Sequence, residues 1–187
     1  NTTDAQIPEY WKEHLDSKIE TIKNYHRAYG RNCFSFIVIA DSHYPSNLGK
    51  ISPLLARKII DDCDIKYVLH AGDYQTRGCH NTKAAIFEEN KDIMKMFEPL
   101  RNRVLWQQGN HDGAYGRFDK DGDGTISNTN KTVLELETYS NSLTHEEMDE
   151  AIYRKVRMAG DAVFDETGTA YYLDDKSNNV RYIGMNT

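Results

Sequence analysis

Three apolar runs, separated by segments with helical periodicity, constrain the fold of this chain more than any other feature. The runs are CFSFIVIA at 33–40, IKYVLHA at 65–71 and RVLWQQ at 103–108, and the helical segments are 51–63 and 81–100. Because strands and helices alternate along the chain, the pattern predicts a parallel sheet covered by helices on its faces. Continuous apolar runs are typical of strands that are buried on both faces. The predicted fold class is therefore α/β.

The flanking segments add an N-terminal helix and a C-terminal hairpin. Apolar residues recur at steps of three and four over 8–29, and Gly30 follows as a stop signal, which predicts an amphipathic helix. The segment 144–156 opens with Thr-x-x-Glu, a helix-capping pattern, and is also predicted to be helical. Two strand-like runs, 169–175 and 178–187, are joined by a polar turn and predict a hairpin.

Length and charge limit the classes of protein to which this chain can belong. Its 187 residues suit one domain, which we divide into an N-terminal helical segment, 1–32, and a domain proper, 33–187. The net charge of −6 argues against tight binding to duplex nucleic acid, which needs clustered Lys and Arg. No apolar run approaches the ~20 residues that span a bilayer, so we expect a soluble protein with no membrane partner. The compartment stays open, with the cytoplasm favoured.

Each of the three apolar runs ends in a cluster of polar residues. The clusters are Asp-Ser-His at 41–43, Gly-Asp at 72–73 and Gly-Asn-His-Asp at 109–112. The carboxyl ends of parallel strands lie along one edge of a sheet, so we expect the clusters to meet there. Side chains two residues apart at a strand end point the same way, which lets Asp41 and His43 hold one cation together. Mixed carboxylate, imidazole and amide ligands suit Mn, Fe or Zn better than Mg or Ca.

The joint occurrence of these clusters resembles a known family. The stretches ADSH, HAGD and QGNHD are similar to the first three motif blocks of the calcineurin-like metallophosphoesterases, and AYYLDDKSNNVRYIGMNT is similar to the hairpin that follows them. The resemblance covers roughly residues 33–187. It implies the α/β metallophosphoesterase fold and hydrolysis of phosphoric esters, as a phosphatase or phosphodiesterase, by hydroxide bound to a pair of divalent transition metals. The substrate would be a small-molecule phosphoester or a nucleotide.

The resemblance also implies roles for individual residues. Asp41 and His43 match ligands of the first metal, Asp73 matches the carboxylate that bridges both metals, and Asn110 matches a ligand of the second. His111 matches the histidine near the leaving-group oxygen, which acts as a general acid or stabilises charge. In such a site two cations ~3.5–4 Å apart acidify a water molecule and neutralise charge on the phosphoryl oxygens.

Other side chains near these motifs have more than one interpretation. Asp112 fits a catalytic supporting role, in which it accepts the ring N–H of His111 and fixes its tautomer, and fits a helix or turn cap equally well. Arg77 and His80 follow the second cluster closely and are weak candidates for contact with a substrate phosphate, with a solvated loop as the favoured interpretation. His70 lies within a buried run, where a hydrogen-bonded core histidine is favoured over a ligand.

The family completes its metal centre with three further histidines, which this sequence does not supply. Of its seven histidines only His145 follows the third cluster, in the first turn of a predicted helix where a surface position is expected. We therefore expect these residues to be the N-terminal part of a longer enzyme, partnered by the remaining C-terminal part of the same domain, and weakly active or inactive alone. The alternative is a binding or scaffold module that has lost catalysis. The intact clusters favour the enzyme, because a degenerate module has no need for clustered polar groups.

An acidic segment after the third cluster is similar to a calcium-binding loop. The insertion 113–143 contains the loop 119–130, which follows the order of ligand positions in an EF-hand. The expected calcium ligands are Asp119, Asp121, Asp123, the carbonyl of Thr125, and Asn130. Asn130 stands where an EF-hand has a bidentate glutamate, so the expected affinity is low. The competing interpretation is an acidic, glycine-rich surface turn.

Overall fold

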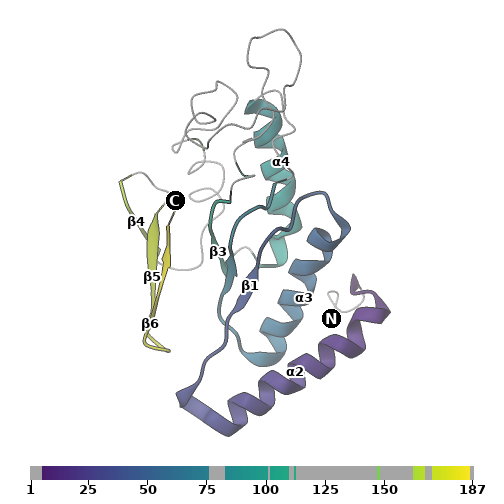
Figure 1. The fold of residues 1–187 in the computed structure, drawn as a ribbon, viewed down its shortest axis with the longest axis vertical. Coiled ribbons are helices and arrows are strands. Elements are labelled where there is room, and N and C mark those ends of the chain that lie inside the picture. Colours follow the sequence, from purple (N-terminus) through teal and green to yellow (C-terminus); the bar gives the residue numbers. More distant parts are fainter. Residues whose placement is uncertain are drawn as a thin grey trace, which may run out of the picture.

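The structure, a computed structural model, contains two small sheets and several helices in the part of the chain that it describes (Figure 1). The described residues are 6–75, 83–100, 102–109, 112, 147, 162–166 and 170–185. The predicted insertion 113–143 and, apart from Glu147, the predicted helix 144–156 lie outside these residues and stay predictions.

Helix α2, Glu9–Tyr29, confirms the amphipathic helix predicted over 8–29. Gly30 ends the helix with a φ of 54°, and its N–H donates to the carbonyl oxygen of His26. Glycine adopts this left-handed conformation without a steric penalty, which is why it is common just past the end of a helix. The predicted end of the helix at Gly30 is therefore confirmed.

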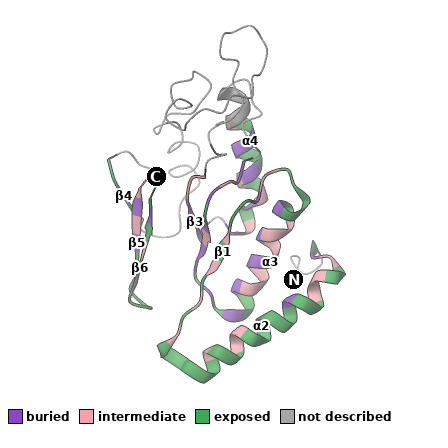
Figure 2. Ribbon diagram, in the orientation of Figure 1, coloured by how far each residue is buried: buried purple, intermediate pink, exposed green. Residues whose placement is uncertain are grey.

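Helix α3, Asn47–Cys63, packs against α2 (Figure 1). The buried side chains of α2 are Leu15 and Ile19, and the Cys63 thiol donates to the carbonyl oxygen of Ile19 at 3.8 Å. Figure 2 shows a largely exposed α2 with a few buried positions. Burial of each such aliphatic side chain contributes about 1.5–3 kcal/mol, so these few contacts hold the N-terminal helix on the domain.

Helix α3 begins four residues before the predicted segment 51–63. The side chain of Ser46 caps its start and accepts the N–H of Gly49 at 3.0 Å. Gly49 and Pro53 both disfavour a helix in isolation. Packing requires the glycine, because a Cβ at Gly49 would lie 2.2 Å from the carbonyl oxygen of Ser42. Tertiary contact thus decides the conformation where local preference would not.

Helix α4, Lys83–Met96, is followed by a short 3-10 turn, Glu98–Leu100, and together they match the helix predicted over 81–100. Ile93 and Leu100 are buried in the main core. Among the described residues, no helix is long and apolar enough to cross a membrane.

Strands β1, Ile37–Ile39, β2, Val68–His70, and β3, Val104–Trp106, form a parallel sheet in that order, with β2 in the middle. In register at their carboxyl ends lie Ile39, His70 and Trp106. Each strand is shorter than the apolar run that predicted it. The parallel sheet and the α/β fold class are confirmed.

One expectation about the faces of this sheet is wrong. β1 is not buried on both faces, because Val38 is 59% exposed whereas Val68 and Val104 are fully buried. β1 is the end strand of the described sheet and pairs with β2 on one side. Within the described chain, helices cover one face of the sheet, where α3 and α4 lie, and a second sheet lies on the other side (Figure 1).

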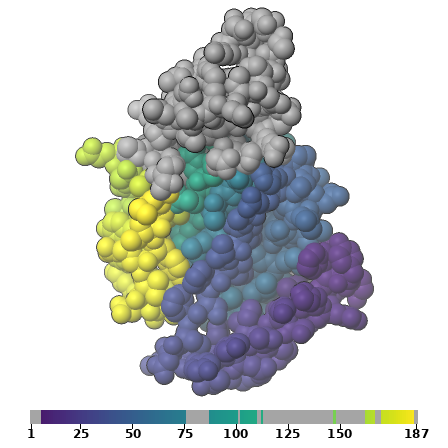
Figure 3. Space-filling view, in the orientation of Figure 1, coloured from purple at the N-terminus to yellow at the C-terminus, as the bar shows by residue number. Residues whose placement is uncertain are grey.

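The second sheet is antiparallel and consists of β4, Val163–Phe164, β5, Tyr171–Asp175, and β6, Val180–Gly184. Strands β5 and β6 confirm the predicted hairpin, whereas β4 was not predicted. The hydroxyl of Tyr171 donates to the carbonyl oxygen of Trp106 at 2.7 Å and so ties this sheet to β3. Figure 3 shows the hairpin, in yellow, lying directly against the blue and teal body of the domain.

Candidate metal centre

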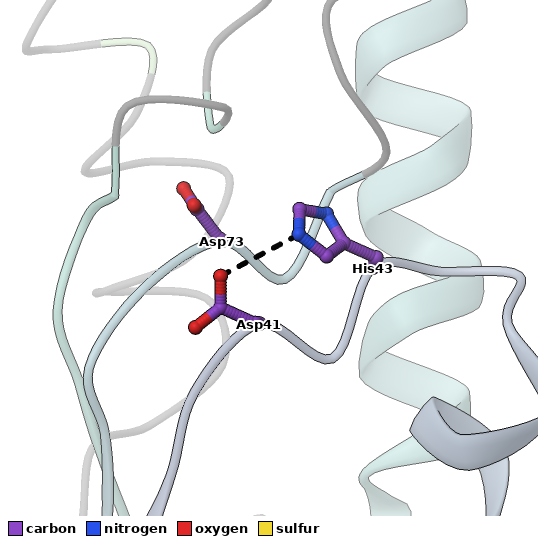
Figure 4. A group of neighbouring side chains, drawn as sticks. All are labelled: Asp41, His43 and Asp73. Atoms are coloured by element: carbon purple, nitrogen blue, oxygen red, sulfur yellow. Dashed lines mark ion pairs between the residues drawn. The ribbon is translucent and has the colours of Figure 1, made fainter.

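The loops that follow β1 and β2 bring three predicted metal ligands together (Figure 4). Asp41 and His43 lie just beyond β1, and Asp73 lies just beyond β2. One ligand atom from each side chain lies within 4.8 Å of the others, and the Nε2 atom of His43 is 3.6 Å from Oδ1 of Asp41. Ligands on opposite sides of one transition metal lie ~4.4 Å apart. The three side chains are therefore close to the geometry of a cation site.

A hydrogen bond to the backbone orients the His43 ring. Its Nδ1 atom lies 3.0 Å from the carbonyl oxygen of Gln75. Because a carbonyl oxygen can only accept, Nδ1 is the donor, and in the neutral ring Nε2 keeps its lone pair. Metal-binding histidines are commonly fixed in this way by an acceptor on the second ring nitrogen. The nitrogen near Asp41 is thus the one that can bind a cation.

The charges of the three side chains also fit a cation. Asp41 is exposed, and His43 and Asp73 are half-buried, so the cluster opens to solvent. Two carboxylates that face one another repel unless a positive charge joins them. Carboxylate oxygen combined with imidazole nitrogen suits Mn, Fe or Zn. The three side chains therefore form a possible ligand set for a divalent metal.

The backbone at all three ligands adopts the left-handed region, where φ is positive. The φ angles are 52° at Asp41, 39° at His43 and 55° at Asp73. Such conformations at residues other than glycine cost on the order of 1–3 kcal/mol and persist where surrounding contacts enforce them. Here the Asp41 N–H donates to the carbonyl oxygen of Gly72 at 3.2 Å, and the His43 N–H donates to that of Asp73 at 3.1 Å. These bonds join the two ligand loops.

Two glycines allow the second and third loops to approach each other. Gly72 has a φ of 98°, and a Cβ there would lie 2.4 Å from the backbone nitrogen of Gly109. A Cβ at Gly109 would lie 2.2 Å from Oδ1 of Asp73 and 2.4 Å from its backbone nitrogen. No real side chain tolerates such distances, so both positions need glycine to keep Asp73 where it is.

The Asp112 carboxylate connects the same two loops. Its Oδ2 atom accepts the N–H of Gly109 at 2.7 Å and that of Asp73 at 2.9 Å, and its Oδ1 atom accepts the N–H of Gln75 at 3.0 Å. The side chain is fully buried. Burial raises the pKa of Asp112 to about 8, against the lowering effect of the backbone donors. The Asp112 side chain therefore binds the backbone of the loop that carries Asp73.

His70 lies in the core below the ligand loops. It is fully buried, and its Nε2 atom is 2.9 Å from the hydroxyl oxygen of Ser42. The Gly72 N–H donates to its Nδ1 atom at 3.2 Å. Burial lowers the pKa of His70 to about 4, so the ring is neutral. This agrees with the prediction of a hydrogen-bonded core histidine.

The sequence analysis missed Gln75, which contacts the centre through its backbone. Its carbonyl oxygen lies against His43, its N–H donates to Asp112, and its side-chain amide donates to Asn90 at 2.5 Å. The side chain is 1% exposed. Two of these contacts use the backbone, which carries no signal in the residue type. A polar residue two positions after Asp73 was the one available indication.

Several predicted site residues lie outside the described residues. They include Asn110, the predicted ligand of a second metal, and His111, the predicted general acid. The same holds for Arg77 and His80, the weak substrate candidates, and for the calcium loop 119–130. Their roles stay predictions.

A pocket of about 790 Å³ lies away from this centre, near the amino ends of β2 and β3. Its basic side chains have structural partners. Arg57 pairs with Asp61 at 2.8 Å, Lys66 pairs with Asp175 at 3.0 Å, and Arg103 donates to a backbone carbonyl at 3.1 Å. The pocket shares no residue with the cluster of ligands.

Comparison with known proteins gives one family match. The sequence profile of a family described as calcineurin-like phosphoesterase matches residues 34–179, well over half of the chain. That range includes both loops that hold the three clustered ligands. The comparison found no match among curated proteins and none among solved structures. The sequence match, together with the parallel sheet, shows that the chain belongs to the calcineurin-like phosphoesterase family.

Proposed function

We propose that this chain hydrolyses phosphoric esters at a divalent-metal centre held by Asp41, His43 and Asp73. The observation that supports it best is the approach of their ligand atoms to within 4.8 Å of one another. The hydrogen bond from His43 to Gln75 adds to this, because it leaves Nε2 able to bind a cation. Divalent metals at this position supply Lewis-acid polarisation of a phosphoryl oxygen and lower the pKa of water.

The roles of the side chains follow from their positions. Asp41 and His43, on one loop, hold the first cation together with Asp73 on the next loop. The family resemblance supports Asp73 as the carboxylate that also binds a second cation. The family resemblance supports Asn110 as a ligand of the second cation and His111 as the proton donor to the leaving group. Asp112 supports catalysis by holding the loop of Asp73 through its N–H.

The substrate class we propose is a small phosphoester or a nucleotide. Asp41 is exposed and the cluster opens to solvent, so an ester can reach it without passing through the core. Arg77 and His80, close in sequence to Asp73, are the candidates for contact with the phosphate. Mn, Fe and Zn are the candidate metals, since the donor set mixes oxygen with imidazole nitrogen.

Hydrolysis of p-nitrophenyl phosphate and bis(p-nitrophenyl) phosphate in MnCl₂ tests this proposal. We expect slow release of nitrophenol that EDTA abolishes, because the histidines that complete the centre in the family are not among these residues. The variant Asp73→Asn should lose the release. Asp174→Asn, which removes an exposed carboxylate on β5 paired with Arg181, is the matched control and should keep it.

The alternative, a binding or scaffold module without catalysis, gives a different result in the same experiment. Calorimetric titration of the chain with MnCl₂ measures metal binding independently of turnover. Binding that depends on Asp73, with no hydrolysis of either ester, is the result expected of the module and would show that these residues alone do not catalyse the reaction. Absence of both binding and hydrolysis would reject the metal centre itself.

We propose in addition a low-affinity calcium site in the loop 119–130, on the sequence alone. Its three alternating carboxylates, Asp119, Asp121 and Asp123, repel one another unless a cation joins them. Titration with CaCl₂ up to millimolar concentration should show binding in the wild-type chain and none in Asp121→Asn. No heat in the wild-type chain would remove the calcium site.

A further inference from the structure

We infer that His70 and Ser42 are positioning residues for the metal ligands, and this inference rests on the proposed function. Ser42 lies between Asp41 and His43 in the first ligand loop, and it is 4% exposed. Its hydroxyl oxygen lies 2.9 Å from Nε2 of His70, the last residue of β2. A single imidazole in the core therefore contacts the loop that carries two of the three ligands.

The same ring also holds the second ligand loop. The N–H of Gly72 donates to Nδ1 of His70 at 3.2 Å, directly before Asp73. Because an amide N–H can only donate, Nδ1 is the acceptor and the proton resides on Nε2, which donates to Ser42. The neutral ring thus makes one hydrogen bond to each loop, with its two nitrogens in complementary roles.

Aromatic side chains fix the plane of this ring. Trp106 stacks on His70 with ring centroids 5.1 Å apart and planes 21° from parallel. Tyr74 and Phe97 contact it edge-on, with centroids 5.7 Å and 5.3 Å away. A ring held on three sides in a packed core cannot rotate without disturbing its neighbours. Its two hydrogen bonds are therefore aimed at fixed points in the loops.

The ligand loops need such a support because their backbone is strained. Asp41, His43 and Asp73 all have positive φ, and Gly72 does as well. Conformations of this kind persist where the surroundings enforce them. The residues that His70 contacts, Ser42 and Gly72, are direct neighbours of these strained ligands. We assign to His70 the task of keeping them in the conformation in which their side chains converge.

Replacement of Ser42 tests this assignment without emptying the core. Ser42→Ala removes the acceptor of the His70 N–H, and Ser42→Thr keeps the hydroxyl. The matched control is Ser35→Ala, because Ser35 makes the same kind of bond to His26, also at 2.9 Å, at the far end of the domain. All three variants are compared with the wild-type chain.

The first measurement is amide hydrogen exchange in EDTA, which needs no metal. We expect exchange at Asp41, His43 and Gly72 to become at least ~10-fold faster in Ser42→Ala, while core amides such as Val68 and Val104 change much less. Ser35→Ala should leave the loop amides unchanged. Equal acceleration of loop and core amides in Ser42→Ala, or none at all, would overturn the positioning role.

The second measurement is the dissociation constant for Mn²⁺. Ser42→Ala should weaken binding ~10-fold or more, as outer-shell partners of metal ligands do, whereas Ser35→Ala and Ser42→Thr stay near the wild-type value. If Ser42→Thr loses as much affinity as Ser42→Ala, the hydrogen bond is not the cause and the inference fails. If no variant and no wild-type chain binds Mn²⁺, the proposed function fails, and hydrogen exchange still decides the positioning role.

Discussion

The Asp112 carboxylate accepts the backbone N–H of Asp73 at 2.9 Å from within the core. The same oxygen accepts the N–H of Gly109 at 2.7 Å. One buried side chain thus connects the loop after β3 to the loop after β2, on which a proposed metal ligand lies. The position of Asp73 depends on a residue that is 39 positions away in the sequence.

Asp112→Asn is expected to weaken the metal centre more than its small change in shape suggests. The amide nitrogen of asparagine cannot accept, so at least one of three backbone N–H groups loses its partner in the core. We expect the free energy of unfolding to fall by about 1–3 kcal/mol and the affinity for Mn²⁺ to fall ~10–100-fold. Denaturant unfolding and calorimetry measure the two quantities.

The control for this change is Asp61→Asn, the same substitution at an exposed position paired with Arg57. Its affinity for Mn²⁺ should equal that of the wild-type chain. If Asp112→Asn and Asp61→Asn bind Mn²⁺ equally well, the link between Asp112 and Asp73 has no effect on the metal centre.

Gly109→Ala should damage the same site through steric overlap. Its Cβ would lie 2.2 Å from Oδ1 of Asp73, which forces the loop or the carboxylate to move. Overpacking of this kind costs about 1–3 kcal/mol of stability, and Mn²⁺ binding should fall with it. Gly30→Ala separates the loss of stability from the loss of Mn²⁺ affinity. A Cβ at Gly30 meets nothing within 4 Å, but the φ of 54° still penalises alanine by about 1–2 kcal/mol.

Gly30→Ala should therefore lose stability and keep Mn²⁺ affinity, while Gly109→Ala loses both. Thermal unfolding in EDTA and titration with MnCl₂ distinguish the variants. Retention of full Mn²⁺ affinity by Gly109→Ala would show that the close approach to Asp73 is not needed.

The parallel strands were predictable because their signal is local and strong. The apolar residues around Val68 and Val104 are consecutive, YVL at 67–69 and VLW at 104–106, as suits buried strands. Polar residues directly after each run then placed Asp41, His43 and Asp73 at one edge, and the structure brings their ligand atoms together. Here the residue types alone carried the information.

The features that were not predicted depend on contacts between distant segments. The first turn of α3 contains Gly49, a poor helix former. Glycine is needed there because a Cβ would overlap the carbonyl oxygen of Ser42. Strand β1 was expected to be buried on both faces, yet Val38 is exposed. The exposure of a strand depends on which elements pack on each face, and the residue types of the strand do not determine that. The role of Gln75 rests on its backbone groups, which any residue possesses. No pattern of residue types reveals these relationships.

Asp175 is expected to be the ionised side chain that contributes most to the attachment of the second sheet. Burial raises its pKa, but hydrogen bonds from Ser177, Asn178 and Lys66 outweigh burial and hold the pKa well below its usual range. Asp175→Asn should lower the free energy of unfolding by about 1–3 kcal/mol at pH 7. Since the folded-state pKa is depressed, this contribution is present above the usual carboxyl range near pH 4 and is lost as the pH falls below it.

The neighbouring residue Asp174 provides the control for that variant. It pairs with Arg181 at 2.7 Å but on the exposed side of β5, where solvent screens the interaction. Chemical denaturation at pH 7 should therefore show a smaller loss in Asp174→Asn than in Asp175→Asn. The reverse order would contradict the role assigned to the Lys66–Asp175 pair.

The change in the free energy of unfolding between pH 4 and pH 7 should depend on His70. Burial lowers its pKa from 6.5 to about 4, so between these values the unfolded chain binds a proton that the folded chain does not. The free energy of unfolding therefore falls as the pH is lowered from 7 to 4, by about 3 kcal/mol for this one group.

The variant His70→Gln tests this. Its glutamine can still donate to Ser42 and accept from Gly72, but it does not titrate. Its unfolding free energy should be lower at pH 7, from lost ring packing, and should lack this part of the pH dependence, whereas the exposed control His14→Gln keeps it. Denaturant unfolding at several pH values between 4 and 7 measures the difference, and parallel curves for His70→Gln and the wild-type chain would show that His70 is not the group that titrates.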